Sequence, residues 1–173
     1  FRVEQYVQMV LCFLRLDSDF TDYVIKEYRV DDIIRPAVRR LAPQFIMKKL
    51  SLEYEQTDEV ALTDEKWLGF VVEQVLSNAV KYTSEGSISI KCDGDRLVIS
   101  DTGIGIAAED LPRIFDKGYT GFNGRADRKA SGIGLYLCRR ICDNLGHSIK
   151  AESAAGQGTT ITIGLRRNKL EVE

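Results

Sequence analysis

The sequence predicts an α+β two-layer sandwich, and two observations support this fold class. Predicted strands occur next to each other twice, at residues 87–100 and 148–165, with helical segments between the two pairs. A parallel α/β sheet would instead alternate single strands with helices. At 173 residues with 44% hydrophobic content, the chain is long enough for one substantial core and too short for two independent ones.

The first segment has the pattern of a helix that packs against other helices. Its apolar residues recur at alternating spacings of four and three: Val3, Val7, Val10 and Leu14. A polar stretch then interrupts this pattern and predicts a boundary. We therefore predict the end of a helical bundle at residues 1–17, a linker at 18–30 and a globular domain at 31–173.

A second helix is expected to begin near Asp31 and Asp32, because acidic residues favour the first turn of a helix. Its apolar positions continue to Phe45. Pro36 fits the first turn of this helix, whereas Pro43 would strain its interior. We therefore expect a kink or an irregular turn at Pro43.

Periodicity and turn residues predict the elements of the rest of the chain. They are strand Ser51–Glu55, helix Asp64–Tyr82, strands Ser87–Cys92 and Arg96–Ser100, short helix Ala107–Phe115, helix Gly134–Leu145, and strands Ser148–Glu152 and Thr159–Leu165. Residues 116–131 lack apolar periodicity and carry more basic than acidic side chains. A loop of this length in a compact domain indicates function or disorder, and its charge would suit closure over phosphates.

Charge and cysteine content restrict the partners and the compartment. The net charge is -2, with basic and acidic residues mixed along the chain, so nucleic acid is not an expected partner. Four cysteines without a signal peptide or a long apolar run indicate reduced thiols in a cytosolic compartment. Cys138 and Cys142 could share a metal on one helix, but His147 lies beyond the helix end, which favours small core residues.

The long helix ends with polar side chains where core residues are expected. Four of them lie on one stripe: Gln74, Asn78, Lys81 and Tyr82. The same stripe begins with Trp67, Phe70 and Val71, so a cavity wall would explain the change. The Asn78 amide oxygen suits magnesium, although an Asn bonded to backbone is the alternative.

Three glycine motifs follow the long helix. In Asp101-Thr102-Gly103-Ile104-Gly105 the carboxylate stands at a strand end, where it could accept a hydrogen bond from the exocyclic amine of adenine. Gly132-Ile133-Gly134-Leu135 opens a helix, the arrangement that binds phosphate, although ordinary loop glycines are the alternative. Gly156-Gln157-Gly158-Thr159 precedes the last strand and fits a hairpin turn at least as well as a nucleotide contact.

In this order the motifs resemble those of the histidine-kinase branch of the Bergerat ATP-binding family, over about residues 31–165. The segment Ser77-Asn78-Ala79-Val80-Lys81-Tyr82-Thr83 is close to that family's Asn box, and Phe115 matches its Phe box. The resemblance implies a mixed sheet of about five strands covered on one face by three helices. It also implies ATP and Mg²⁺ as cofactors.

Residue roles follow from the resemblance. Asn78 would coordinate magnesium, Lys81 would contact phosphate and Tyr82 would pack on adenine. Asp101 would bind the adenine amine. The remaining implied nucleotide contacts are Gln74, Gly103, Gly105, Ile106, Phe115, Lys117, Arg128, Ser131, Gly132, Ile133, Gly134, Leu135 and Thr160.

The resemblance also implies partners. Residues 1–30 would be the end of a dimerisation helix and a linker, and the phosphoacceptor histidine would lie on a dimerisation domain outside this sequence. A response regulator would receive the phosphoryl group. Residues 70–78 are similar to small Gram-positive kinases that sense peptide antibiotics together with ABC transporters. The full-length protein would then be a membrane-anchored homodimer, with this domain in the cytoplasm.

One position departs from the hydrolytic relatives. Type II topoisomerases have a Glu four residues before the Asn as general base for water, where this chain has Gln74. An amide cannot accept that proton, and the neighbouring Glu73 is rotated by about 100° around the helix. The sequence therefore favours a phosphotransferase, with a nucleotide-dependent interaction module as the first alternative and a topoisomerase-type ATPase as the second.

Overall fold

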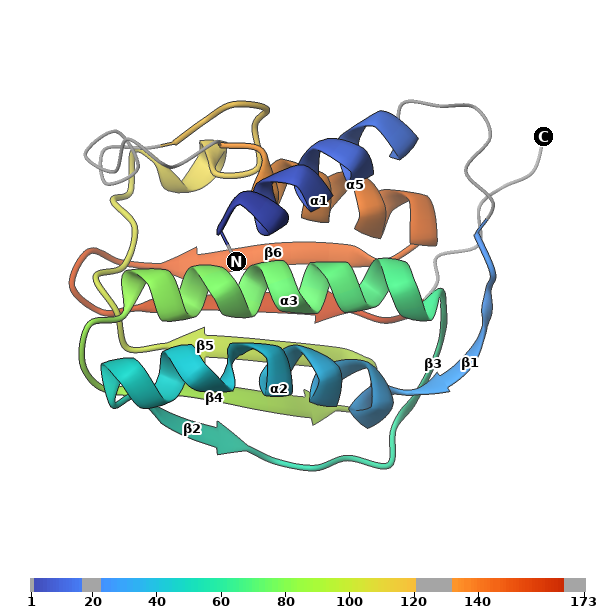
Figure 1. Cartoon of the computed structure of the whole chain (residues 1–173), viewed down its shortest axis with the longest axis horizontal. Helices are drawn as coiled ribbons and strands as arrows, with labels where there is room; N and C mark the ends of the chain where they lie inside the picture. The colour runs from blue at the N-terminus through green and yellow to red at the C-terminus, as the bar shows by residue number, and fades with distance from the viewer. Residues whose placement is uncertain (1, 17–22, 121–131, 167–173) are drawn as a thin grey trace.

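The computed structural model describes residues 2–16, 23–120 and 132–166. Its centre is a five-stranded sheet with strand order β2-β4-β5-β7-β6. The strands are β2 (Ser51–Tyr54), β4 (Ser87–Asp93), β5 (Arg96–Asp101), β6 (Ser148–Ser153) and β7 (Thr159–Gly164). β2 runs parallel to β4 and the other neighbours are antiparallel. Helices α2 (Val30–Lys48), α3 (Glu65–Tyr82) and α5 (Gly134–Leu145) cover one face (Figure 1), which confirms the predicted mixed two-layer fold.

The core lies between this sheet and the helices. Ile90, Ile99 and Ile161 form one row across β4, β5 and β7, and none is more than 6% exposed. Burying such a row against the helices removes apolar surface from water. Alternate residues of a strand share a face, so Asp101, two residues after Ile99, also points to the helix side of the sheet.

Helix α2 runs through both of its prolines, so Pro36 is not in the first turn and no irregular turn interrupts the helix at Pro43. Because it begins at Val30, Pro36 lies beyond the first turn, and the helix continues past Pro43 to Lys48. Each proline leaves the carbonyl four residues earlier without its helical donor. Those carbonyls belong to Asp32 and Arg39, which are exposed, so water can replace the missing donor.

A small two-stranded ribbon was not predicted. β1 (Lys26–Arg29) pairs antiparallel with β3 (Val60–Thr63), and β1 lies inside the stretch predicted as a linker. Each strand has four residues, and β1 is mostly charged. Because three of the four residues of β1 are charged, its sequence carries no apolar alternation that would predict a strand.

The predicted helix Ala107–Phe115 is wrong in extent and type. The structure has turns there and a single 3₁₀ turn at Leu111–Arg113. Pro112 lies within this turn and has no backbone N–H, so it cannot make the i→i−4 hydrogen bond that the predicted α-helix would need there.

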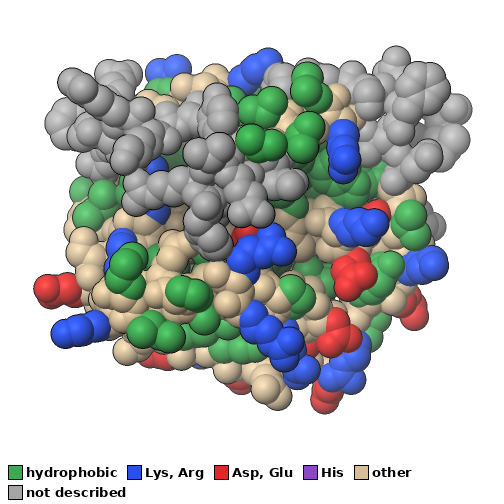
Figure 2. Space-filling view, in the orientation of Figure 1, with side chains coloured by type: hydrophobic (Ala, Val, Ile, Leu, Met, Phe, Trp, Pro, Cys, Tyr) green, Lys and Arg blue, Asp and Glu red, His purple; other side chains and the backbone are tan. Residues whose placement is uncertain are grey.

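Helix α1 (Arg2–Leu16) packs on α5 and not on the sheet. Its side chains Cys12 and Leu16 are buried. The outer face of α1 carries hydrophobic side chains (Figure 2), namely Val7, Val10, Leu11 and Leu14, which are 37–60% exposed. Most of the apolar repeat that the sequence shows is therefore uncovered in the described structure.

The four cysteines are free thiols, and three of them are buried. Burial raises the pKa of Cys142 to about 12 and that of Cys12 to about 11. Such thiols stay protonated and are poor metal ligands. Within the described ranges no helix is long and apolar enough to span a membrane.

Candidate functional site

Helix α3 carries the predicted polar stripe. It begins at its N-cap Asp64, whose carboxylate accepts hydrogen bonds from the backbone N–H groups of Lys66 (2.9 Å) and Trp67 (3.1 Å). Along the helix, one face is buried in the core by Leu68, Val71, Val72, Val75, Leu76, Ala79 and Val80. Gln74, Asn78 and Tyr82 are half-buried beside this face, and Lys81 is exposed with its Nζ 4.9 Å from the Tyr82 ring centroid.

Asp101 ends β5 on the helix side of the sheet and is half-buried. Its Oδ1 accepts a hydrogen bond from the Gly103 N–H at 2.8 Å. Burial raises the pKa of Asp101, while hydrogen bonding from Gly103, Thr159 and Thr83 partly opposes that rise. A carboxylate in this setting can accept a further hydrogen bond from a ligand amine.

The turn after Asp101 is fixed from two sides. Ile104 N–H donates to the Tyr82 carbonyl of α3 (3.1 Å), and Gly156 N–H donates to the Ile104 carbonyl (2.7 Å). Gly105 has a φ of 67°, and a Cβ there would lie 1.9 Å from the Ala154 oxygen. Only glycine fits this position, so the turn ties the end of α3 to the β6–β7 connection.

The Gly156–Gly158 segment is a turn packed against Asp101. A Cβ on Gly158, which has a φ of 79°, would lie 1.9 Å from the Asp101 carbonyl oxygen. In the following strand Thr159 pairs with Asp101 and shares its face, whereas Thr160 pairs with Ser100. The Thr160 Oγ1 lies 2.9 Å from Ser100 Oγ, so the structure does not bring Thr160 to the other predicted residues.

The start of α5 meets the polar stripe of α3. A Cβ on Gly134 would lie 2.6 Å from Gln74 Nε2, and Gly132 has a φ of 65° and accepts a hydrogen bond from Gly118 N–H at 2.9 Å. Ile133 and Leu135 flank this start and are half-buried. The N-terminus of α5, where helix N–H groups can receive phosphate, therefore lies beside the predicted magnesium helix.

The segment before the long loop is partly anchored. Phe115 is half-buried against the core, with the Arg139 guanidinium 5.5 Å from its ring centroid. Ile106 N–H donates to Ser153 Oγ at 2.9 Å, and Lys117 is exposed. The predicted residues Arg128 and Ser131 lie outside the described part of the chain.

Two threonines near Asp101 were not predicted as site residues from the sequence. Thr83 is fully buried next to the Asp101 turn, where its hydroxyl helps to oppose the rise in the pKa of Asp101. Thr159 Oγ1 lies 3.0 Å from Ser153 Oγ. Thr83 directly follows the polar stripe, so its signal was present in the sequence. The face of Thr159 follows only from its pairing with Asp101 in the sheet.

The two-layer fold and the groups at the end of its central strand agree with the ATP-binding class that the motifs predicted. Residues 63–169 match the family described as "Histidine kinase-, DNA gyrase B-, and HSP90-like ATPase". The chain belongs to this family, as the ordered motifs predicted.

Curated relatives include sensor kinases of Gram-positive bacteria. The chain is 34% identical over 167 residues to the sensor histidine kinase YxdK of Bacillus subtilis, covering 92% of this chain and 51% of that protein. It is 38% identical over 148 residues to the sensor protein BceS of Halalkalibacterium halodurans, covering 82% and 44%. The sensor histidine kinase GraS of Staphylococcus haemolyticus is 34% identical over 169 residues, covering 94% and 48%. The chain thus spans about half the length of these relatives.

Solved structures share the fold. Full-length ShkA in complex with AMPPNP superposes with a TM-score of 0.74 at 22% identity, covering 95% of this chain and 36% of that chain. A nucleotide-free catalytic domain of the histidine kinase ThkA gives a TM-score of 0.67 at 18% identity, covering 83% and 96%. These likenesses support the architecture of this chain. They do not assign a role to any individual residue.

Proposed function

We propose that this chain is the ATP-binding catalytic domain of a two-component sensor histidine kinase. The observation that carries the proposal is the half-buried Asp101 carboxylate at the end of the central strand β5, where the end of α3 and the Gly156–Gly158 turn meet. The start of α5 contacts the same helix through Gln74. An adenine acceptor and a phosphate-binding helix start would thus lie along one side of α3.

In this proposal the nucleotide lies along the last turns of α3. Asp101 accepts a hydrogen bond from the adenine amine, Tyr82 packs on the ring, and Gly103 and Gly105 allow close approach. Lys81 and the N–H groups at Gly132–Gly134 contact phosphate. Thr159, on the face of Asp101, replaces Thr160 as the expected contact on β7.

Magnesium is proposed to bind at Asn78. The half-buried Asn78 offers one neutral oxygen, which suits an ion that takes its remaining ligands from water and substrate phosphates. No described cluster of three or more acidic, His or Cys residues offers an alternative metal site. The bound ion would supply charge neutralisation between the phosphates.

The site is proposed to hold ATP without hydrolysing it. Gln74 cannot accept a proton from water. Glu73, the nearest carboxylate on the helix, is turned toward α2, where its Oε2 accepts a hydrogen bond from Arg40 Nη1 at 2.9 Å. No general base for water is therefore supplied by this part of α3.

The phosphoryl acceptor is proposed to be a histidine on a separate dimerisation domain. Its imidazole nitrogen attacks the γ-phosphorus in line, the bond to the β–γ bridging oxygen breaks, and ADP leaves. The phosphohistidine then passes its phosphoryl group to an aspartate of a response regulator. His147 does not fit the acceptor role, because it is buried with its Nε2 2.9 Å from Thr63 Oγ1.

The whole protein is proposed to be a membrane-anchored homodimer with this domain in the cytoplasm. Similarity to BceS, GraS and YxdK over most of the chain supports a sensor kinase. The similarity of residues 70–78 to the peptide-antibiotic-sensing type supports an ABC transporter as a further partner.

The test joins this domain to its dimerisation domain. With ATP labelled at the γ-phosphate and Mg²⁺ present, the protein is expected to acquire acid-labile, base-stable phosphate, and the isolated chain to bind ATP without acquiring it. Nucleotide binding with no labelling of the joined protein would instead support an interaction module. Rapid release of inorganic phosphate by the isolated chain would support an ATPase.

A further inference from the structure

The C-terminus of α3 lacks the backbone cap that ends the other two sheet-covering helices. α2 ends at Lys49 and α5 at Gly146, both in the left-handed conformation, and in each case the N–H of the cap donates back into the last turn. α3 ends at Thr83, which is extended. The last carbonyls of α3 therefore need other donors.

Lys48, on the last turn of α2, supplies those donors. Its Nζ donates to the carbonyl of Val80 at 2.5 Å, that of Lys81 at 3.1 Å and that of Thr83 at 3.0 Å. The side chain is half-buried, so its stem is packed while its ammonium meets the helix end. A positive charge at a helix C-terminus is also favourable for the helix dipole.

The capped turn is the one that carries the proposed nucleotide contacts. Lys81 and Tyr82 belong to it, and Asn78 lies one turn earlier. The remaining carbonyl of this turn, that of Tyr82, accepts the hydrogen bond from Ile104 N–H. The end of α3 is therefore fixed by α2 on one side and by the Asp101 turn on the other.

We infer that Lys48 is a positioning residue for the nucleotide site: by capping α3 it holds Tyr82, and through Tyr82 the Asp101 turn, in the arrangement that binds ATP. This inference rests on the proposed function of the same site. Lys48 acts through the helix end and does not itself touch the nucleotide.

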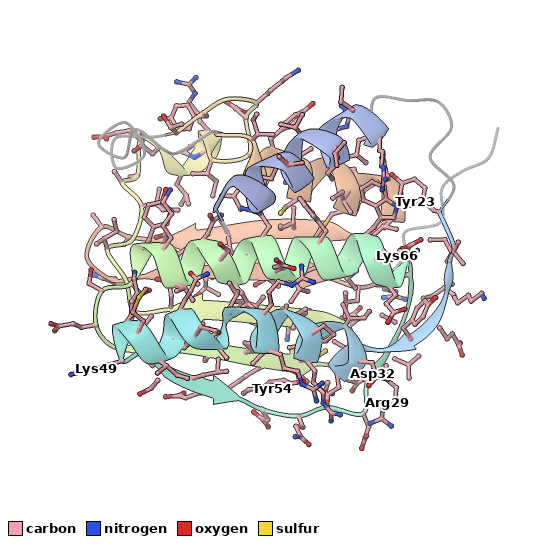
Figure 3. The ribbon with its side chains drawn as sticks, in the orientation of Figure 1. Tyr23, Arg29, Asp32, Lys49, Tyr54 and Lys66 are labelled. Atoms are coloured by element: carbon pink, nitrogen blue, oxygen red, sulfur yellow. The ribbon has the colours of Figure 1, made fainter. Side chains whose placement is uncertain are left out.

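The test compares three variants of the full chain. Lys48→Met removes the donors but keeps most of the stem, and Lys48→Arg keeps a charged donor group. Lys66→Met is the matched control, because Lys66 is an exposed lysine at the opposite end of α3 (Figure 3). ATP affinity is measured by calorimetry at a temperature where every variant is fully folded, and amide exchange of Ile104 is followed by NMR.

Lys48→Met is expected to weaken ATP binding about tenfold, with Lys48→Arg between it and the wild type and Lys66→Met unchanged. Exchange of the Ile104 amide should accelerate most in Lys48→Met and should be unchanged in Lys66→Met, because in Lys48→Met the Tyr82 carbonyl is no longer held. A lower melting temperature with unchanged ATP affinity and unchanged Ile104 exchange would overturn the inference and leave a purely stabilising cap. Failure of the wild type and of Lys66→Met to bind ATP would instead overturn the proposed function.

Discussion

At the scale of single residues, the carboxylate of Asp101 combines burial with a set of backbone donors. Gly103 N–H fixes its Oδ1, and the adjacent Thr83 hydroxyl is buried. The group is thus oriented before a ligand arrives, which reduces the ordering cost of binding. The same burial raises the pKa of Asp101. The ionised carboxylate therefore lowers the stability of the folded chain.

Asp101→Asn is expected to weaken ATP binding at least about tenfold while the domain stays folded, because the amide offers one acceptor where the carboxylate offers two. Asp95→Asn, at an exposed hairpin carboxylate, is the control and should bind normally. Titration with ATP and circular dichroism measure the two properties. Normal binding by Asp101→Asn would exclude Asp101 as the adenine acceptor.

The same variant gives a prediction for the pH dependence of stability. The pKa of Asp101 in the folded chain is raised above its ordinary value of 3.8. The folded state therefore binds this proton more tightly than the unfolded state, and stability falls as pH rises from 3.8 through the raised pKa. The wild type should lose free energy of unfolding relative to Asp101→Asn over this interval, as urea unfolding at a series of pH values would show. A difference that is constant with pH would contradict it.

Asn78→Asp is expected to weaken Mg²⁺-dependent ATP binding much more than it lowers stability. The aspartate is nearly isosteric, so the fold tolerates it, but it adds a negative charge beside the triphosphate. ATP affinity with and without Mg²⁺ and thermal unfolding are the measurements. Asn144→Asp, on the exposed face near the far end of α5, is the control. Loss of the folded state in Asn78→Asp would show that Asn78 is a structural residue.

At the scale of elements, the site depends on close contact between two turns. Gly105→Ala should destabilise the domain by about 3 kcal/mol or more, since its Cβ would meet the Ala154 oxygen at 1.9 Å in addition to the strain of a positive φ. Gly94→Ala is the matched control, because Gly94 has a φ of 58° with nothing within 4 Å of the added atom. It should cost only about 1–2 kcal/mol. Urea unfolding measures both, and equal costs would show that the turns can separate.

Elements with a regular apolar pattern were predictable from the sequence, including the four-residue strand β2, and elements without one were not. The helix at 64–82 and the four strands of the two pairs were predicted because packing on one core imposes a regular pattern. The ribbon of β1 and β3 and the 3₁₀ turn at Leu111–Arg113 depend on a few backbone bonds and one proline. Lys48 acts through contacts with carbonyls more than 30 residues away in the sequence, which no local pattern records.

At the scale of the whole molecule, the helix–sheet unit has a buried core, whereas α1 is only half covered. Cys12 and Leu16 pack inward, but Val10 and Leu14 are 37% and 60% exposed. The alternating spacing of the apolar residues on α1 is that of a helix that buries one seam against helical partners, and the described residues of that seam are exposed. We therefore expect the outer face of α1 to pack against other helices. When the chain is alone, these helices would belong to a second copy of it.

A double substitution, Val10→Ser with Leu14→Ser, is expected to weaken self-association of the chain about tenfold or more, since it removes apolar area from the outer face of α1. ATP affinity should not change, because neither side chain belongs to the nucleotide site. The matched control is Ile46→Ser with Met47→Ser, which removes two more exposed apolar side chains, at 77% and 76%, from α2. Sedimentation equilibrium measures association. An equal effect of both pairs would indicate nonspecific hydrophobic contact, whereas an effect of the α1 pair alone would identify α1 as the helix that joins two copies.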